Sequence, residues 1–311
     1  MIKNFDELLE LAKAGPRVRV VVAAAEDEAA LKAVTDAIHN NIAEALLIGN
    51  VAAIKSMISK FDLKESDYMH IIGTFNDEMA AQLAVRLIRA GNADILLKGK
   101  IKTAVLLKAV LSPELGLKRS KLLSDVFVLE NPLRGENKLM IISDGGVTIQ
   151  PDIQQKIEII DNAVQVAHVI GYDMPKVALL SAVEVPNPKI QSTVDAAVIS
   201  KMNKRGQIKG CIIDGPLALD NAISEEAARL KNIVSPVAGK ADILICPEIE
   251  SANMLAKSTT YFASYRLAHV VIGSIAPVLI PSRADAPDAK LHSIALGKLI
   301  YQFVRQEEAV S

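Results

Sequence analysis

Short runs of β-branched and other apolar residues alternate along the chain with longer segments whose apolar residues recur at helical spacing. The run Val18–Ala23 predicts a strand, and Met79, Leu83 and Leu87 recur every four residues in a segment that predicts a helix. This alternation is typical of βαβ units around mainly parallel sheets. The sequence predicts strands at Val18–Ala23, Ala45–Ile48, His70–Ile72, Ile95–Leu97, Val177–Leu180, Gly210–Ile213, Ile243–Ile245 and Val270–Ile272. It predicts helices at Glu26–Asn41, Val51–Lys60, Asn76–Ala90, Ile153–Ile170, Ile190–Asn203 and Glu248–Tyr265.

The last segment has a pattern of its own. Pro277–Ile280 predicts a strand, and Pro287 stands where the first residue of a helix would, with Asp285 or Ala286 as its cap. An apolar stripe then continues along the predicted helix through Leu291, Ala295, Leu299 and Phe303. A helix with so apolar a face must pack on something, and we expect it to pack on the first half of the chain.

The order of these patterns predicts two lobes. Two apolar segments, Val126–Leu129 and Leu139–Ile142, flank the turn-rich Asn131–Gly135, which predicts a hairpin or an interdomain connection, and a second αβ series follows. We therefore predict an α/β protein with two αβα lobes, mainly parallel sheets and an interdomain cleft. The first lobe would comprise residues 1–135 plus 276–311, and the second residues 136–275.

Composition narrows the class of protein. Among 311 residues, 35 Lys and Arg balance 36 Asp and Glu, so no basic excess favours nucleic acid as a partner. Cys211 and Cys246 both lie in apolar runs, which favours a reducing cytoplasm over a disulfide framework. The amino-terminal residues do not resemble a signal peptide. The long uncharged run Val270–Ser282 is broken by two prolines, so we expect a buried pair of strands and no membrane span.

The turn around Ser282 is the first candidate site. It lies between a predicted strand end and a predicted helix start, where backbone N–H groups and the helix dipole attract anions. Arg283 adds a planar cationic fork suited to phosphate, Ser282 can donate to an oxyanion, and Asp285 or Asp288 can serve as a base. In the alternative interpretation, Asp285 caps the helix, Asp288 complements its dipole and Arg283 pairs with one of them.

A second cluster, Lys98-Gly99-Lys100-Ile101-Lys102-Thr103, also follows a predicted strand and opens a helix. Gly99 would let the backbone approach a ligand, while Lys98, Lys100 and Thr103 could bind phosphate oxygens. The cluster lacks the spacing of a P-loop. A solvated basic turn is the alternative.

Two further turns follow apolar strands. Ser143 and Asp144 precede a pair of glycines, and Asp214 and Gly215 precede a proline. Because strand ends line the ligand-facing edge of such sheets, we count all four residues as candidate substrate contacts. Tight turns that use glycine for its backbone freedom are the alternative.

Several absences from the sequence constrain the chemistry. No G-x-G-x-x-G opens a helix, no G-x-S-x-G nucleophile elbow is present, and the histidines do not have zinc-ligand spacing. Neither cysteine has an activating neighbour in the sequence. We therefore predict no bound cofactor and no metal, and a mechanism based on positioning and electrostatics.

Three strings resemble the phosphate acetyltransferase/butyryltransferase family, and the resemblance extends over essentially the whole chain. They are Asp242–Met254 (DILICPEIESANM), Asp214–Asp220 (DGPLALD) and Pro277–Asp285 (PVLIPSRAD). The Asp-Gly-Pro-Leu-Ala and Ser-Arg-Ala-Asp-Ala-Pro forms are similar to the butyryl branch of that family.

The resemblance implies a reversible transfer in which butyryl-CoA and phosphate give butyryl phosphate and CoA through a ternary complex. It also implies coenzyme A as a substrate, two lobes with a cleft, a homodimer or higher homo-oligomer, and no metal or prosthetic group. The Ser-Arg pair of the acetyl branch falls on Ser282 and Arg283. The chain departs from that branch at two positions, with Asp285 in place of Cys and Ala289 in place of the proposed catalytic Asp, which leaves Asp285 and Asp288 as substitutes.

Three alternatives remain open at this point. An acetyl-preferring enzyme differs from a butyryl enzyme only in the volume of its acyl pocket, which discriminates weakly. A decarboxylating dehydrogenase on a related fold would need a cofactor site and clustered metal-binding aspartates. A non-catalytic relative would bind acyl-CoA without turnover.

Overall fold

The computed structural model describes residues 1–63, 67–120, 122–131, 138–282 and 285–310. Contacts between residues divide the chain into two compact units. Unit A comprises Phe5–Ser120 and Leu267–Ser311, and unit B comprises Met1–Asn4 and Lys121–Arg266. Each unit alternates strands with helices, so the predicted α/β class with mainly parallel strands is confirmed. The predicted lobe boundaries and the predicted interdomain cleft stay predictions.

The strands of unit A lie in the order β3-β2-β1-β4-β11-β10. Neighbouring strands are parallel, except that β10 and β11 are antiparallel, with Val271 opposite Val278. This pair confirms the two strands expected within the long uncharged run. Strand β4 is buried at every position, which is typical of parallel strands that are covered on both faces. The strands are β1 (Val18–Ala23), β2 (Ala43–Gly49), β3 (Met69–Gly73), β4 (Ile95–Lys98), β10 (Leu267–Ile272) and β11 (Val278–Leu279).

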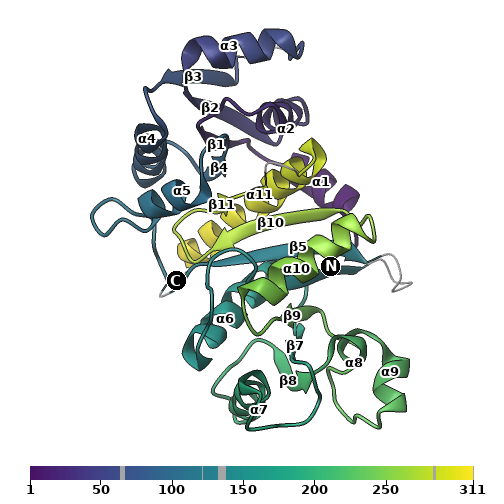
Figure 1. Ribbon diagram of the computed structural model, residues 1–311. Helices are drawn as coiled ribbons and strands as arrows, with labels where there is room; N and C mark the ends of the chain where they lie inside the picture. The colour runs from purple at the N-terminus through teal and green to yellow at the C-terminus, as the bar shows by residue number, and fades with distance from the viewer. Residues whose placement is uncertain (64–66, 121, 132–137, 283–284, 311) are drawn as a thin grey trace. The chain divides into compact units, whose positions relative to one another are not determined.

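Helices cover both faces of these strands, and α2 and α4 lie on opposite sides of β1 and β2 (Figure 1). Three of the helices begin at side-chain caps. Asp27, Asn50 and Asn76 each accept the N–H of the residue three positions later, at 2.8–2.9 Å. These caps fix where each helix begins after its preceding strand. The helices of unit A are α1 (Phe5–Lys13), α2 (Glu28–His39), α3 (Val51–Lys60), α4 (Asp77–Arg89), α5 (Thr103–Val110) and α11 (Pro287–Val310).

The C-terminal helix α11 packs on α1, α2 and β10, which confirms that it joins the first part of the chain. Pro287 is its first residue, as the sequence predicts. Within the predicted apolar stripe, Ala295 is buried, and Leu291, Leu299 and Phe303 are half-buried. The buried positions run from His292 to Lys298 without a break. Since α1, α2 and the strands contact different faces of α11, the helix is covered over more than one stripe.

One of the buried residues of α11 is a lysine. Lys298 is 0 % exposed, and its Nζ has no hydrogen-bond partner among the described residues. Burial lowers the pKa of Lys298, and the nearby charge of Arg17 lowers it further. An unsatisfied buried polar group of this kind is destabilising.

We expect Lys298→Met to stabilise the protein, because methionine fills a similar volume without burying an unpaired ammonium. Removing such a group recovers roughly 1–3 kcal/mol, which corresponds to a rise of several degrees in Tm. A calorimetric or circular-dichroism melt of the two proteins measures the change. A lower Tm for the variant would show that Lys298 makes a stabilising contact.

The strands of unit B lie in the order β5-β6-β9-β7-β8. Strands β5 and β6 are antiparallel, with Phe127 opposite Ile142, which confirms a hairpin at this point of the sequence. Strands β6, β9, β7 and β8 are parallel, so their carboxyl ends share one edge. The strands are β5 (Ser124–Asn131), β6 (Lys138–Ser143), β7 (Lys176–Leu180), β8 (Ile212–Leu217) and β9 (Ile243–Ile245).

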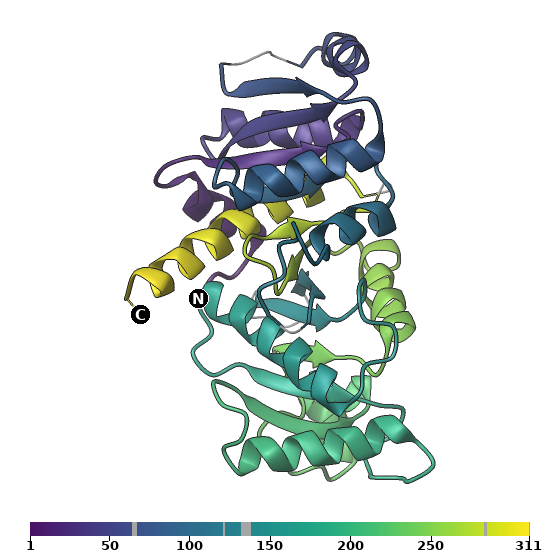
Figure 2. The same cartoon turned by 90° about the vertical axis from the view of Figure 1, so that its left-hand side faces the viewer.

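The helices of unit B also lie on both sides of its strands. In Figure 1, α6 and α7 lie on one side, and α8 and α9 on the other. Figure 2 gives the second view, in which α6 and α7 run across the front of the strands. Glu248 precedes α10 and forms a capping box with Ser251, as expected of a carboxylate at a helix start. The helices are α6 (Ile153–Val169), α7 (Gln191–Lys204), α8 (Leu219–Ile223), α9 (Glu225–Leu230) and α10 (Ile249–Tyr261).

The stretch around Asp214 is not the turn that the sequence predicts. Asp214 and Gly215 lie within β8, which continues to Leu217. The pairing of β7 with β8 changes register between Ala178 and Leu180, and this irregularity accommodates the Gly-Pro pair. Strand β8 lies at the end of the strand order of unit B, a position in which a strand tolerates proline.

Candidate active site

Strand β11 and helix α11 are joined by a short corner that contains the first candidate residues. Ser282 is exposed and Asp285 is half-buried. The backbone N–H of Ser282 donates to Oδ2 of Asp285 at 2.7 Å, and the N–H of Asp285 donates to the carbonyl of Ser282 at 3.2 Å. These two reciprocal hydrogen bonds close the corner. The carboxylate of Asp285 therefore accepts a hydrogen bond from the residue that begins the corner. Among the described residues, no hydrogen bond from the first turn of α11 to this carboxylate is observed, which would be the contact of a helix cap.

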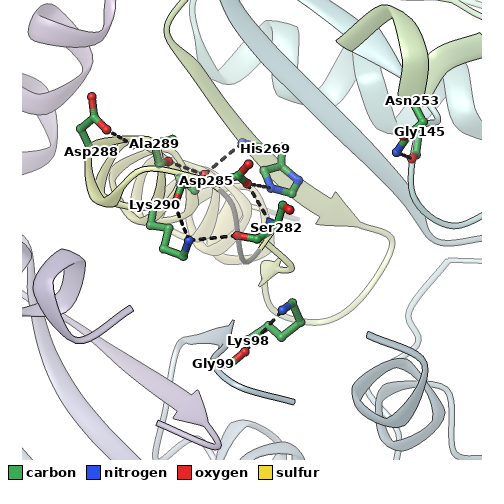
Figure 3. Close-up of polar contacts among 11 residues, drawn as sticks. Lys98, Gly99, Gly145, Asn253, His269, Ser282, Asp285, Asp288, Ala289 and Lys290 are labelled. Carbon is green, nitrogen blue, oxygen red and sulfur yellow. Dashed lines mark hydrogen bonds and ion pairs between the residues drawn. The ribbon is translucent and has the colours of Figure 1, made fainter. Parts of the chain in front are cut away.

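Lys290 reaches back from α11 to the same corner (Figure 3). Its Nζ donates to the carbonyl of Ser282 at 3.0 Å and to the carbonyl of Asp285 at 2.8 Å. The side chain is 1 % exposed. Burial lowers the pKa of Lys290, and the charges of Asp27 and Asp285 oppose that effect. Lys290 thus ties both ends of the corner to the first turn of the helix.

His269 faces Asp285 from the neighbouring strand β10. Its Nε2 lies 3.6 Å from Oδ2 of Asp285, and its side chain is 7 % exposed (Figure 3). Burial raises the pKa of Asp285, but the nearby imidazole of His269, the N–H of Ser282 and the charge of Lys290 act against it. The net result is a pKa below the usual value, so the carboxylate is ionised at neutral pH.

Sequence reasoning missed both His269 and Lys290. The signal for His269 was available, because it adjoins the apolar run Val270–Ile272, which predicts a buried strand, and a buried histidine requires a polar partner. Lys290 gave no comparable signal, since a lysine in the first turns of a helix is ordinarily solvated.

The sequence also predicts Arg283 and Asp288 as residues of this site. Arg283 lies outside the described residues. Asp288 is exposed in the first turn of α11, and its Oδ1 accepts the N–H of Ala289 at 3.0 Å. That position suits a carboxylate that complements the helix dipole.

The Lys98 cluster lies at the same edge of unit A as the Ser282 corner. Strands β4 and β11 are parallel neighbours, with Leu97 opposite Leu279, so their carboxyl ends meet. Gly99 follows β4 directly, and an added Cβ would run into the backbone of Ala24. The loop needs glycine for this close approach.

One polar side chain of the cluster makes a hydrogen bond within the loop itself. Lys98 is buried, and its Nζ donates to the carbonyl of Gly99 at 3.3 Å. Lys100 is exposed, while Thr103 is half-buried as the first residue of α5. The structure therefore brings the Lys98 cluster and the Ser282 corner to one edge, and their roles as substrate contacts stay predictions.

In unit B, Ser143 and Asp144 are buried at the end of β6. Ser143 Oγ donates to the carbonyl of Asp125 at 3.0 Å. The carboxylate of Asp144 accepts four backbone N–H groups at 2.8–3.1 Å, that of Asp125 in β5 and those of Gly146, Val147 and Thr148 in the turn. Burial raises the pKa of Asp144 to about 6, although these N–H donors favour the charged form. Both side chains thus organise the turn, and substrate contact by them stays a prediction.

Asp214 and Gly215 lie on β8, next to β7, in the same unit. Oδ1 of Asp214 accepts the N–H of Gly215 at 2.9 Å, and Ser200 Oγ donates to the carbonyl of Gly215 at 3.2 Å. An added Cβ on Gly215 would meet Leu179. The glycine is therefore required by strand packing, and a substrate role for the pair remains untested.

A small cavity at the ends of β7 and β9 is polar on one side. It is lined by the ion pair of Lys156 and Asp195, whose Nζ and Oδ2 are 2.6 Å apart, and by Cys246. The volume that the centre of a water molecule can occupy in this cavity is about 10 Å³. This is enough for about one water molecule. This cavity is too small for an acyl chain.

The cysteines are unsuited to nucleophilic catalysis. Both are free and buried. Burial raises the pKa of Cys211 to about 11 and that of Cys246 to about 12, which keeps both thiols protonated at neutral pH.

Within the part of the chain that the structure describes, no three or more His, Cys, Asp and Glu side chains are grouped so as to hold a metal ion. No described helix has the length and apolar character of a membrane span.

Comparison with known proteins extends the family resemblance to the whole chain. The family described as phosphate acetyl/butaryl transferase matches residues 4–82 and 75–297. A phosphate butyryltransferase of Clostridium beijerinckii is 47% identical over 300 residues, which cover 96% of this chain and 98% of that protein. The chain belongs to this family.

The other relatives include an acetyl enzyme. A phosphate acetyltransferase of Thermotoga maritima is 45% identical over 291 residues, covering 94% of this chain and 97% of that protein. The crystal structure of a branched-chain phosphotransacylase from Enterococcus faecalis has a TM-score of 0.79 and 33% identity, covering 91% of this chain and 99% of that one. The fold and the family are therefore shown together.

Proposed function

We propose that the chain is a phosphate acyltransferase that converts butyryl-CoA and phosphate into butyryl phosphate and CoA, reversibly. The observation that carries the proposal is the 47% identity to a phosphate butyryltransferase over nearly the full length of both proteins. The site of unit A supports it, because Ser282, the serine of the family's Ser-Arg string, stands at a corner with an ionised carboxylate. Coenzyme A enters as a substrate, and the reaction requires no prosthetic group.

Asp285 is the proposed base in the direction that consumes butyryl phosphate. Its carboxylate accepts the proton of the CoA thiol, and the thiolate attacks the carbonyl carbon to form a tetrahedral oxyanion. The new C–S bond remains, and the bond between the carbonyl carbon and the oxygen that bridges to phosphorus breaks. Phosphate leaves with the proton that Asp285 returns. The reverse sequence gives the acyl phosphate from phosphate and the thioester.

Donors near the corner are proposed to stabilise the charge. Ser282 is exposed and can donate its hydroxyl to the oxyanion, and Arg283 is proposed to bind the phosphate. Lys98, Gly99, Lys100 and Thr103 lie at the same edge and are proposed to hold phosphate groups. A proposed role for Ser143, Asp144, Asp214 and Gly215 in holding CoA rests on their positions on parallel strands of unit B.

An acetyl preference is the second candidate. The relative from Thermotoga maritima is nearly as similar to this chain as the butyryl enzymes are, and its name specifies acetyl. A pocket discriminates by only about 10- to 200-fold for one methylene, so few residues separate the two specificities.

A thiol-release assay tests the proposal. Purified protein is given acetyl-, propionyl-, butyryl- or isobutyryl-CoA, each with and without phosphate. We expect free thiol only when phosphate is present, with butyryl-CoA giving the highest kcat/KM. Release without phosphate would indicate a thioesterase, and binding without release would indicate a non-catalytic relative.

The assembly and the location of the protein are also proposals. Apolar side chains are exposed along and beside α10, with Met254 and Tyr261 each 66 % and Phe262 91 % exposed. Such side chains favour contact with a second copy of the chain, so we propose a homodimer, which sedimentation of the purified protein measures. The free cysteines are compatible with the proposed cytoplasmic location.

A further inference from the structure

We propose that His269 is a positioning residue that holds Asp285 ionised and correctly oriented for acyl transfer. The proposal rests on the proposed function, because it assigns His269 to the base of that reaction. Its first support is geometric. Nε2 of His269 lies 3.6 Å from Oδ2 of Asp285, and the same oxygen accepts the N–H of Ser282 at 2.7 Å. Nε2 of His269 and the N–H of Ser282 therefore lie beside the same carboxylate oxygen, the N–H as a hydrogen-bond donor and the imidazole as an ion-pair neighbour when it is protonated.

The placement of His269 is rigid. Its backbone N–H donates to Oγ of Ser293 at 3.0 Å, and that hydroxyl donates to the carbonyl of Ala289 at 2.9 Å. Strand β10 is thereby tied to the second turn of α11, the helix that begins just after the corner. Because the His269 side chain is only 7 % exposed, it does not meet the substrate directly. It acts through Asp285.

The charges around Asp285 determine the sign of the effect. His269 faces it from β10 and Lys290 from α11, while Asp27, in the loop before α2, acts on Lys290. The imidazole of His269, in its protonated form, lowers the pKa of Asp285. A base must be ionised to accept a proton, so loss of His269 raises the pH at which Asp285 becomes active.

Two substitutions separate the contributions of His269. His269→Gln keeps an N–H donor near the position of Nε2 but removes the charge, and His269→Leu removes both. The measurement is kcat/KM for CoA against pH, in the direction that consumes butyryl phosphate. We expect the acidic limb of the profile to move to higher pH in both variants, and further in His269→Leu than in His269→Gln.

Three controls make the result specific. His39→Gln removes an exposed histidine at the end of α2 and should leave the profile unchanged. In an Asp285→Asn background, His269→Leu should cause no further shift, because its effect passes through that carboxylate. Thermal melts identify any variant that does not fold, and His269→Gln, the more conservative change, then carries the test.

Failure of this proposal can be distinguished from failure of the proposed function. If the wild type releases thiol only with phosphate but both variants keep the wild-type profile at reduced activity, His269 is merely structural and the proposal is overturned. If the wild type shows no phosphate-dependent release, the proposed function itself fails.

Discussion

Asp285→Asn is expected to lower kcat for the reaction of butyryl phosphate with CoA by about 100- to 10,000-fold, the usual contribution of a general base. Asparagine keeps the shape of the side chain and an oxygen that can accept the N–H of Ser282, so the corner should remain closed. It does not accept a proton from a thiol at neutral pH. Because binding groups elsewhere are unchanged, KM for butyryl phosphate should change little. Initial rates with varied butyryl phosphate and saturating CoA measure both constants.

Asp288→Asn is the comparison that decides between the two candidate carboxylates. Asp288 is exposed and accepts the N–H of Ala289, so its expected role is to complement the dipole of α11. Losing this interaction should lower the stability of the folded protein by about 0.3–1 kcal/mol and leave kcat nearly unchanged. A larger loss of kcat in Asp288→Asn than in Asp285→Asn would reverse the assignment of the base.

Local patterns were sufficient to predict most elements. Strand β1 and helix α3 have the bounds that the sequence predicts, because a β-branched run and a helical apolar period are both contained in a few consecutive residues. The Ser282 corner was predictable for the same reason. Strand, turn and Pro287 follow one another in the chain, and the order alone places the corner at a strand's carboxyl end.

Features that depend on distant contacts could not be predicted in this way. The burial of Lys290 requires the corner to fold back onto the helix, and the role of His269 requires β10 to lie beside β11. Asp214 resembled a turn residue, because glycine and proline usually end a strand. Its strand continues because β7 supplies a partner across an irregular register, which no local pattern encodes.

Lys290→Met is expected to reduce both activity and stability. The substitution removes the two hydrogen bonds to the carbonyls of Ser282 and Asp285, so the half-buried Asp285 carbonyl loses its donor while the Ser282 carbonyl keeps the N–H of Asp285. An unsatisfied buried group costs about 1–3 kcal/mol, so Tm should fall by several degrees. Asp285 would no longer be fixed relative to the helix, and a displacement of about 1 Å at a catalytic group reduces the rate by about 100-fold. A thermal melt and the kcat for butyryl phosphate and CoA measure the two effects.

Lys298→Met is a matched control for this experiment, because the two lysines lie on the same helix and are 1 % and 0 % exposed. They differ in their partners. Lys290 donates to two carbonyls of the corner, whereas Lys298 Nζ has no hydrogen-bond partner among the described residues. We expect opposite changes in Tm and a loss of kcat only in Lys290→Met. Equal changes in both variants would mean that burial of a lysine in α11, and not its attachment to the corner, determines the result.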